Sequence, residues 1–218
     1  MRSVAPVPDP TPDAVPGPPG PTPDPARVQD GAAGLQSALL LLVPAAEPAV
    51  GEHRVRLDAS ARDGVPAHLT VLYPFLPPAL IDDAVLTSLA ALFAGFPAFA
   101  FTLDRVGWFG EDVVWLGPRD EAPFRALTAL AFEAFPSCAP YGGRYDDVVP
   151  HLTIGHRGGA PALRAVAEAV RPHLPIAATV TEVTLMAGPA PGTPPGQWRK
   201  LAAFPLAAPS PVNPAPST

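Results

Sequence analysis

The chain has 218 residues, 48% of them hydrophobic, with 34 prolines, one cysteine and a formal charge of −6. Proteins that hold long stretches of nucleic acid are usually strongly basic, so the acidic balance argues against extended nucleic-acid binding. A single cysteine excludes an internal disulfide, and no apolar segment has the roughly 20 residues that a membrane-spanning helix needs. We therefore expect a cytoplasmic protein that does not engage membranes.

Both ends of the chain are poor in residues that build a core. Residues 1–33 contain ten prolines and no large aliphatic side chain other than valine. Such a segment cannot bury enough apolar surface to offset the entropy lost on ordering. We predict disordered, proline-rich tails over 1–34 and 208–218, and one two-lobed domain over 35–207.

The first half of this domain alternates between strand-like and helix-like patterns. A strand over 36–43 leads into a weaker helix candidate over 47–57, and a second strand follows over 68–75. Apolar residues within 80–93 fall at helical spacing, and those within 99–103 alternate as in a half-buried strand.

The second half of the domain shows a similar order of elements. A strand over 113–116 follows a turn centred on Gly110 and is expected to pair back as a hairpin. Apolar stripes predict helices over 124–135 and 163–170. The remaining strands are predicted over 151–154, 179–186 and 198–206, with the last two paired.

The tripeptide His-Leu-Thr occurs twice, at residues 68–70 and 151–153. Each copy opens a predicted strand, on which positions i and i+2 face the same side. Each copy therefore presents an imidazole and a hydroxyl, His68 with Thr70 and His151 with Thr153, toward one point.

The surroundings of the two copies also repeat, at the same offset along the chain. Pro-Ala-Leu begins ten residues after each histidine, at 78–80 and at 161–163. The alternative is coincidence in a chain rich in proline and alanine. Duplication of a unit (strand, helix, His-x-Thr strand, helix, strand) instead predicts an α+β fold of two pseudo-twofold lobes. We expect two antiparallel sheets with outer helices and a central groove that the His-x-Thr strands line.

Two histidines suit proton transfer on a phosphate ester. With an ordinary pKa near 6.5, one imidazole can be neutral and accept a proton while the other is charged and donates one. Thr70 and Thr153 would hold the phosphoryl oxygens, on which negative charge builds in the transition state. This scheme needs no metal and no cofactor, and the reverse reaction exchanges the two histidine roles.

Residues 68–75 (HLTVLYPF) and 149–154 (VPHLTI) resemble the motifs of the two-histidine phosphoesterase superfamily, specifically its 2'-5' RNA ligase-like proteins. The resemblance covers about residues 35–207. It implies a bilobed fold with His68, Thr70, His151 and Thr153 as the catalytic set. It also implies metal-independent 2',3'-cyclic phosphodiesterase or 2'-5' phosphodiester chemistry on a nucleotide or RNA terminus, and we expect a monomer.

Contacts outside the paired motifs are less distinctive. Arg62 and Arg144 lie in matching loops before the two histidines and are the predicted substrate-binding residues, with Arg157 and Arg199 as further options. Tyr73 is an odd number of residues from His68, so we expect it to face away from the groove, in a core or edge position. Further aromatic residues are expected in the core, with a stacking surface as the alternative; these are Trp108, Phe109 and Trp115.

Competing interpretations remain for the histidines and for the groove. His151 and His156 have a spacing seen in zinc sites, but no cysteine pair accompanies them, so we expect no metal site. His156 follows Gly155 and is expected to be an exposed loop residue, with the groove rim as the alternative. The rival function is a binding module that holds a phosphorylated ligand without turning it over.

Overall fold

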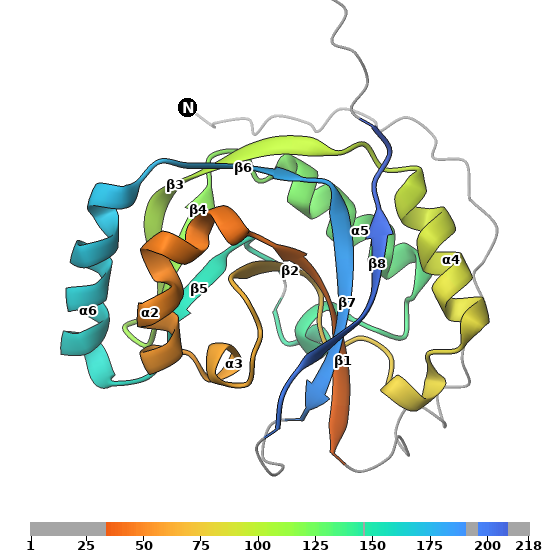
Figure 1. The fold of residues 1–218 in the computed structure, drawn as a ribbon, viewed down its shortest axis with the longest axis horizontal. Helices are drawn as coiled ribbons and strands as arrows, with labels where there is room; N and C mark the ends of the chain where they lie inside the picture. The colour runs from red at the N-terminus through yellow and green to blue at the C-terminus, as the bar shows by residue number, and fades with distance from the viewer. Residues whose placement is uncertain (1–33, 146, 191–195, 209–218) are drawn as a thin grey trace, which may run out of the picture.

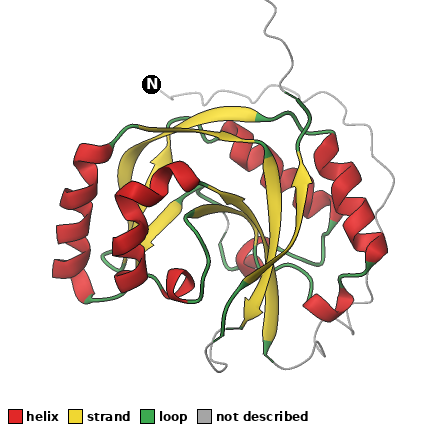
Figure 2. Cartoon of the chain, in the orientation of Figure 1, coloured by secondary structure: helices red, strands yellow, loops and turns green. Residues whose placement is uncertain are grey.

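The computed structural model describes residues 34–145, 147–190 and 196–208. The predicted tails, apart from Gly34 and Ala208, therefore lie outside the described residues. Within these residues, eight strands form two four-stranded antiparallel sheets, and helices flank the strands on both sides (Figures 1 and 2). The predicted α+β fold with a duplicated architecture is confirmed.

The two sheets have equivalent strand orders, β2-β1-β7-β8 and β5-β4-β3-β6. The strands of the first sheet are β1 (Leu35–Leu42), β2 (His68–Leu72), β7 (Glu182–Pro189) and β8 (Arg199–Pro205). The strands of the second sheet are β3 (Phe99–Phe109), β4 (Val113–Pro118), β5 (Leu152–Gly155) and β6 (Ile176–Val180).

Helices occupy the connections that the apolar stripes predicted. The α-helices are α2 (Glu47–Leu57), α3 (Ala59–Arg62), α4 (Asp83–Ala94), α5 (Ala122–Ala134) and α6 (Gly159–Val170). Short 3-10 turns are η1 (Pro44–Ala46), η2 (Pro78–Leu80), η3 (Pro140–Gly143) and η4 (Arg171–His173). Helix α4 begins later than predicted because the Asp82 carboxylate accepts a hydrogen bond from the Val85 amide at 2.9 Å, which caps the helix there.

The two halves of the chain exchange strands. In each half the His-x-Thr strand pairs with the first strand, β2 with β1 and β5 with β4. A strand of each half then crosses over: β3 of the first half pairs with β4, and β7 of the second half pairs with β1. Neither half therefore completes its sheet without the other.

The prediction of one strand over 179–186 is wrong, because this segment divides between the two sheets. Val180 ends β6 and pairs with Phe99 of the second sheet, whereas Glu182 begins β7 in the first sheet. The apolar alternation changes phase at the crossing, because Val180 and Val183 are three residues apart, and the prediction of one strand overlooked this shift.

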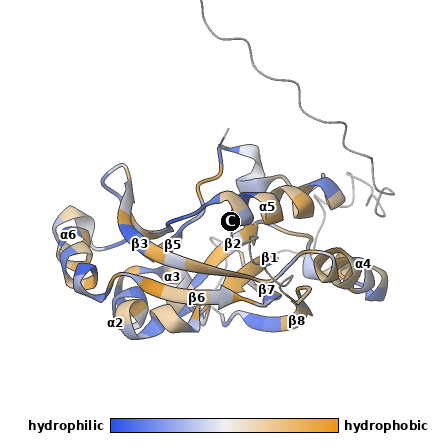
Figure 3. Cartoon of the chain, turned by 90° about the horizontal axis from the view of Figure 1, so that it is seen from above, coloured by the Kyte–Doolittle hydropathy of each residue, from blue (hydrophilic) through white to orange (hydrophobic). Residues whose placement is uncertain are grey.

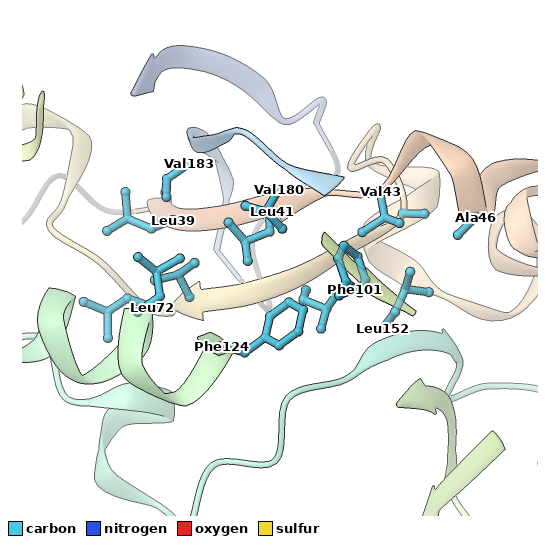
Figure 4. Close-up of a cluster of buried hydrophobic side chains, with 14 of the residues drawn as sticks. Leu39, Leu41, Val43, Ala46, Leu72, Phe101, Phe124, Leu152, Val180 and Val183 are labelled. Carbon is cyan, nitrogen blue, oxygen red and sulfur yellow. The ribbon is translucent and has the colours of Figure 1, made fainter. Parts of the chain in front are cut away.

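One large apolar core lies between the sheets and helices. It includes residues of both sheets, among them Leu39, Leu72 and Leu152 (Figure 4). Figure 3 shows the central strands as mainly hydrophobic, with more hydrophilic residues on outer helices such as α2 and α6. The two lobes share this core, so close packing fixes their position relative to each other.

Phe124 of α5 joins the helix layer to the second sheet. Its ring makes edge-to-face contacts with Phe99 and Phe101, each with centroids 5.1 Å apart. We predict that Phe124→Ala lowers the free energy of unfolding by about 3–5 kcal/mol, because it leaves a cavity beneath β3. Urea denaturation measures the change. Phe132→Ala is the control on the same helix, since Phe132 is 36% exposed; equal losses for the two variants would contradict the prediction.

Candidate active site

The two His-x-Thr strands lie side by side between the lobes. Strands β2 and β5 are edge strands of their sheets and contact each other (Figure 1). His68 opens β2, and His151 immediately precedes β5. The two motifs, which are distant in the sequence, are therefore brought together in the tertiary structure.

Each histidine makes the same backbone hydrogen bond. Nδ1 of His68 lies 2.7 Å from the carbonyl oxygen of Pro66, and Nδ1 of His151 lies 2.7 Å from that of Val149. A carbonyl oxygen only accepts, so Nδ1 must carry the proton in both rings. Nε2 of each imidazole is then the atom left for proton transfer.

The two imidazoles differ in how strongly their environment opposes a positive charge. Burial, followed by the positive charge of Arg54, lowers the pKa of His68 to about 4, and His151 makes a smaller contribution in the same direction. Burial also lowers the pKa of His151, although the hydrogen bond to Val149 opposes this shift. Both rings are therefore neutral at pH 7 in the free protein.

A β-bulge follows each threonine. Thr70 pairs with Leu40 and Leu72 with Leu39, so that Val71 is the extra residue. The second strand has the matching register shift, with Thr153 opposite Trp115 and Gly155 opposite Val114. A bulge reverses the alternation of side chains beyond it.

The bulges turn Tyr73 and His156, which occupy equivalent positions after the two motifs, toward the groove. Both residues line the same cavity as His68 and Thr70. The prediction that Tyr73 faces away is wrong, because it assumed uninterrupted alternation along the strand. His156 is exposed, as expected, and it also lies at the groove rim, with Nδ1 3.6 Å from an oxygen of Asp58.

The cavity extends from the first motif across the face of the first sheet. It has a volume of about 910 Å³ and reaches from His68 to Trp198. Of the two predicted substrate-binding residues, Arg62 lines this cavity, together with Arg157. Arg144 is exposed at the end of η3 and is not among the lining residues, and neither is Arg199.

His151 and Thr153 lie beside this cavity and do not line it. The ring of Phe109 packs edge-on against His151, with centroids 4.9 Å apart, and the centroid of Trp115 lies 6.0 Å from His151. Trp115 is held closely against the sheet, since a Cβ at Gly107 would approach its ring to 2.2 Å. The rings of Phe109 and Trp115 thus pack against the imidazole of His151. Trp108 instead lines a separate cavity near α6.

Arg54 is the residue of the site that the sequence reasoning missed. It is only 1% exposed, and its guanidinium forms an ion pair with Asp58 at 2.8 Å. It also donates to the carbonyl oxygens of Thr153, at 3.1 Å, and Val65, at 3.2 Å. Arg54 therefore connects the second motif to the loop that leads into the first. No local signal marks it, because arginines on helices are usually solvated.

Neither a metal cluster nor a membrane span is found in the described part of the chain. No group of three or more His, Cys, Asp or Glu residues is placed there to hold a metal ion. None of the described helices is long and apolar enough to cross a bilayer.

The fold and the paired motifs define a duplicated α+β protein with two facing His-x-Thr strands. Residues 42–189 match the family model of the 2'-5' RNA ligase superfamily, so the chain belongs to that superfamily of two-histidine phosphoesterases. No curated protein matches the chain in sequence.

Solved structures are similar to this chain at low sequence identity. A Thermus thermophilus protein is 18% identical, with a TM-score of 0.52, and the match covers 80% of this chain and 98% of that one. Escherichia coli LigT in complex with 3'-AMP is 21% identical, with a TM-score of 0.48, and the match covers 79% and 98%. A structure described as a phosphoesterase is 24% identical, with a TM-score of 0.47 and coverage of 79% and 98%.

The buried ion pair of Arg54 generates a prediction about stability. Arg54→Leu removes the guanidinium from the buried Asp58 carboxylate, which then keeps only its hydrogen bonds from Ser60 and the neighbouring His156 ring, so we expect the free energy of unfolding to fall by about 3–5 kcal/mol. The matched control is Arg171→Leu, which removes an exposed pair with Glu168 at 3.1 Å and should cost less than about 1 kcal/mol. Urea denaturation compares the two variants, and a small loss for Arg54→Leu would show that the buried pair is not a structural requirement.

Proposed function

We propose that the protein is a metal-independent phosphoesterase that opens 2',3'-cyclic phosphates or cleaves 2'-5' phosphodiester linkages at an RNA end or in a small nucleotide. The observation that carries this proposal is the matched pair of imidazoles on adjoining strands. In each, the hydrogen bond at Nδ1 leaves Nε2 for proton transfer. A threonine lies two residues along from each histidine and supplies a hydroxyl donor.

The environments of the two histidines suggest a division of roles. His68, whose pKa is lowered to about 4, stays neutral and acts as the general base. Its Nε2 takes a proton from water as the water oxygen attacks phosphorus. His151 acts as the general acid, and its protonated Nε2 donates to the departing 2' or 3' oxygen. Thr70 and Thr153 donate hydrogen bonds to the non-bridging phosphoryl oxygens.

The cavity offers space and surfaces for a nucleoside. Its volume of about 910 Å³ is within the range of small-molecule sites, and it lies directly beside His68 and Thr70. Ala38 and Leu40 contribute apolar surface, while Tyr73 and Trp198 supply aromatic rings. These surfaces are suited to a nucleobase and a sugar.

Positive charge around the site is local. Arg62 and Arg157 line the cavity of a chain whose net charge is −6. We infer that these two arginines contact phosphate groups of the substrate, with Arg144 as a further contact outside the cavity. Such an arrangement suits a terminus or a small nucleotide better than a long duplex.

One observation favours the rival function, a module that binds a phosphorylated ligand without turnover. Both imidazoles are neutral at pH 7 in the free protein, so the leaving oxygen has no charged donor until the substrate is bound. A bound phosphate is negative and raises the pKa of nearby imidazoles, which would restore the donor. Activity assays distinguish turnover from binding alone.

We predict that His68→Ala and His151→Ala each abolish hydrolysis of 2',3'-cyclic nucleotides and 2'-5' linked dinucleotides, because each removes one partner in proton transfer. Thr70→Ala should lower kcat about 10²- to 10³-fold, as the loss of a transition-state donor does. Chromatographic product assays with EDTA present measure these effects.

The control for the histidine variants is His173→Ala, because His173 is exposed at η4, away from β2 and β5. Turnover that disappears with EDTA in the wild type would contradict a metal-independent mechanism. Turnover that survives either active-site substitution would contradict the paired roles.

The pH dependence of kcat/KM follows from the two lowered pKa values. The base must be neutral, so the rate rises with pH through about 4, where His68 loses its proton. The acid must be protonated, so the rate falls above the pKa of His151, which lies below 6.5. We expect a bell-shaped profile with its maximum below about pH 6.5. Initial rates in constant-ionic-strength buffers test this, and a maximum above pH 7 would overturn the assignment.

A further inference from the structure

The cavity beside the first motif extends along β1 to a polar residue, Gln36. Alternate residues of β1 share one face of the sheet, and Leu40, Ala38 and Gln36 line the cavity from that face. Leu40 pairs with Thr70 of the first motif, and Gln36 lies four residues earlier along β1. With a rise of about 3.3 Å per strand residue, Gln36 lies roughly 13 Å along the strand from the level of Thr70. A ligand whose phosphate is held at Thr70 would therefore reach Gln36 with its opposite end.

Aromatic rings flank this end of the cavity. Tyr73 follows β2 and Trp198 precedes β8, so the two rings come from opposite sides of β1 in the sheet. Both rings pack against the same small apolar cluster, which includes Ala38. Trp198 lies close against Gly188, the β7 partner of Gln36, since a Cβ at Gly188 would approach its indole ring to 2.3 Å. Aromatic surface and a carboxamide therefore meet at one end of the cavity.

Two hydrogen bonds fix the orientation of the half-buried Gln36 carboxamide. Nε2 donates to the carbonyl oxygen of Pro189 at 3.2 Å, and because a carbonyl oxygen only accepts, the amide cannot be reversed. Oε1 accepts from the Tyr73 hydroxyl at 2.8 Å. The amide has no further hydrogen-bond partner among the described residues. One N–H of Nε2 and one lone pair of Oε1 are therefore left to bind a ligand.

This pair of groups matches the edge of adenine that carries N6 and N7. The N6 amino group donates and N7 accepts, so a carboxamide can bind both atoms at once, as glutamine does with adenine in DNA. The same edge of guanine carries two acceptors, O6 and N7, and would set an acceptor against Oε1 of Gln36. Cytosine and uracil have one hydrogen-bonding group at the corresponding edge and a single ring, so they would bind the carboxamide less completely.

We propose that Gln36 is the specificity-determining residue of the cavity and that it selects adenine nucleotides, with the phosphate beside His68 and Thr70. This inference rests on the phosphoesterase function proposed above and names its substrate class. Nε2 of Gln36 donates to N7 of the base, and Oε1 accepts from the N6 amino group. The rings of Tyr73 and Trp198 supply apolar contact surface for the base. Gln36 lies far from the phosphorus, so it acts on the choice of substrate and not on proton transfer.

The test compares the 2',3'-cyclic phosphates of adenosine, of guanosine and of purine riboside, which lacks the 6-amino group. In the wild type we expect kcat/KM for the adenosine substrate to exceed the other two values by roughly five- to hundredfold, chiefly through KM. Gln36→Ala should make the three values nearly equal. The ratio is taken within one variant, so a smaller folded fraction lowers all three rates alike and leaves the ratio unchanged.

The matched control is Gln197→Ala. Gln197 also lines the cavity, but its amide donates to the carbonyl oxygen of Arg62 at 3.3 Å and comes from a different segment of the chain. Gln197→Ala should keep the wild-type preference for adenine. The proposal is overturned if the wild type turns over all three substrates equally, if Gln36→Ala retains the preference, or if the control loses it to the same extent.

Binding measurements distinguish failure of base selection from failure of the proposed function. Turnover without a preference for adenine overturns base selection alone. If the wild type turns over none of the three substrates, the phosphoesterase proposal fails, and calorimetric titration with the 2'-monophosphates of adenosine and guanosine replaces the rate assay. A Kd roughly five- to hundredfold lower for the adenosine compound, with equal Kd values in Gln36→Ala, would still support the adenine site. Equal Kd values in the wild type, or no binding, would overturn it.

Discussion

The arrangement of the site depends on the ion pair and the hydrogen bonds that the buried guanidinium of Arg54 makes. Its ion pair with Asp58 neutralises it, and it also donates to the carbonyl oxygens of Thr153 and Val65 and to the hydroxyl of Ser60. One side chain of α2 therefore fixes the second His-x-Thr strand and the loop before the first. A buried charge tolerates few alternative positions, because each displacement leaves a polar group unpaired. The same charge disfavours a proton on His68.

The two halves hold their His-x-Thr motifs in nearly the same way, but the residues around the two motifs differ. Both histidines bond a carbonyl two residues earlier, and both threonines precede a bulge. The residues placed at the groove by the bulges nevertheless differ, with Tyr73 in one half and His156 in the other. The cavity also lies on one side only, next to the first motif. A site of this kind can assign different roles to two identical tripeptides, because the surroundings of the tripeptides are not repeated.

Much of the fold could be predicted from local patterns. The alternation within 99–103 and the helical stripe within 80–93 correspond to real elements, because a strand or helix must bury one face wherever it packs. The division of 179–186 between two sheets was missed, because the change of phase between Val180 and Val183 does not show that the later residues join another sheet; a bulge within one strand gives the same change. Tyr73 was placed on the wrong face because a bulge depends on pairing with β1, a strand that helices α2 and α3 separate from β2 in the sequence.

The sequence by itself determined the two His-x-Thr motifs, their matched spacing and the duplicated order of elements, because these are properties of residue type and position along the chain. Only the tertiary structure decided which strands the halves exchange and that Arg54 is buried between the motifs. The physical reason is that these contacts join residues far apart in sequence, and their energies depend on burial and pairing that exist only when both partners are in place.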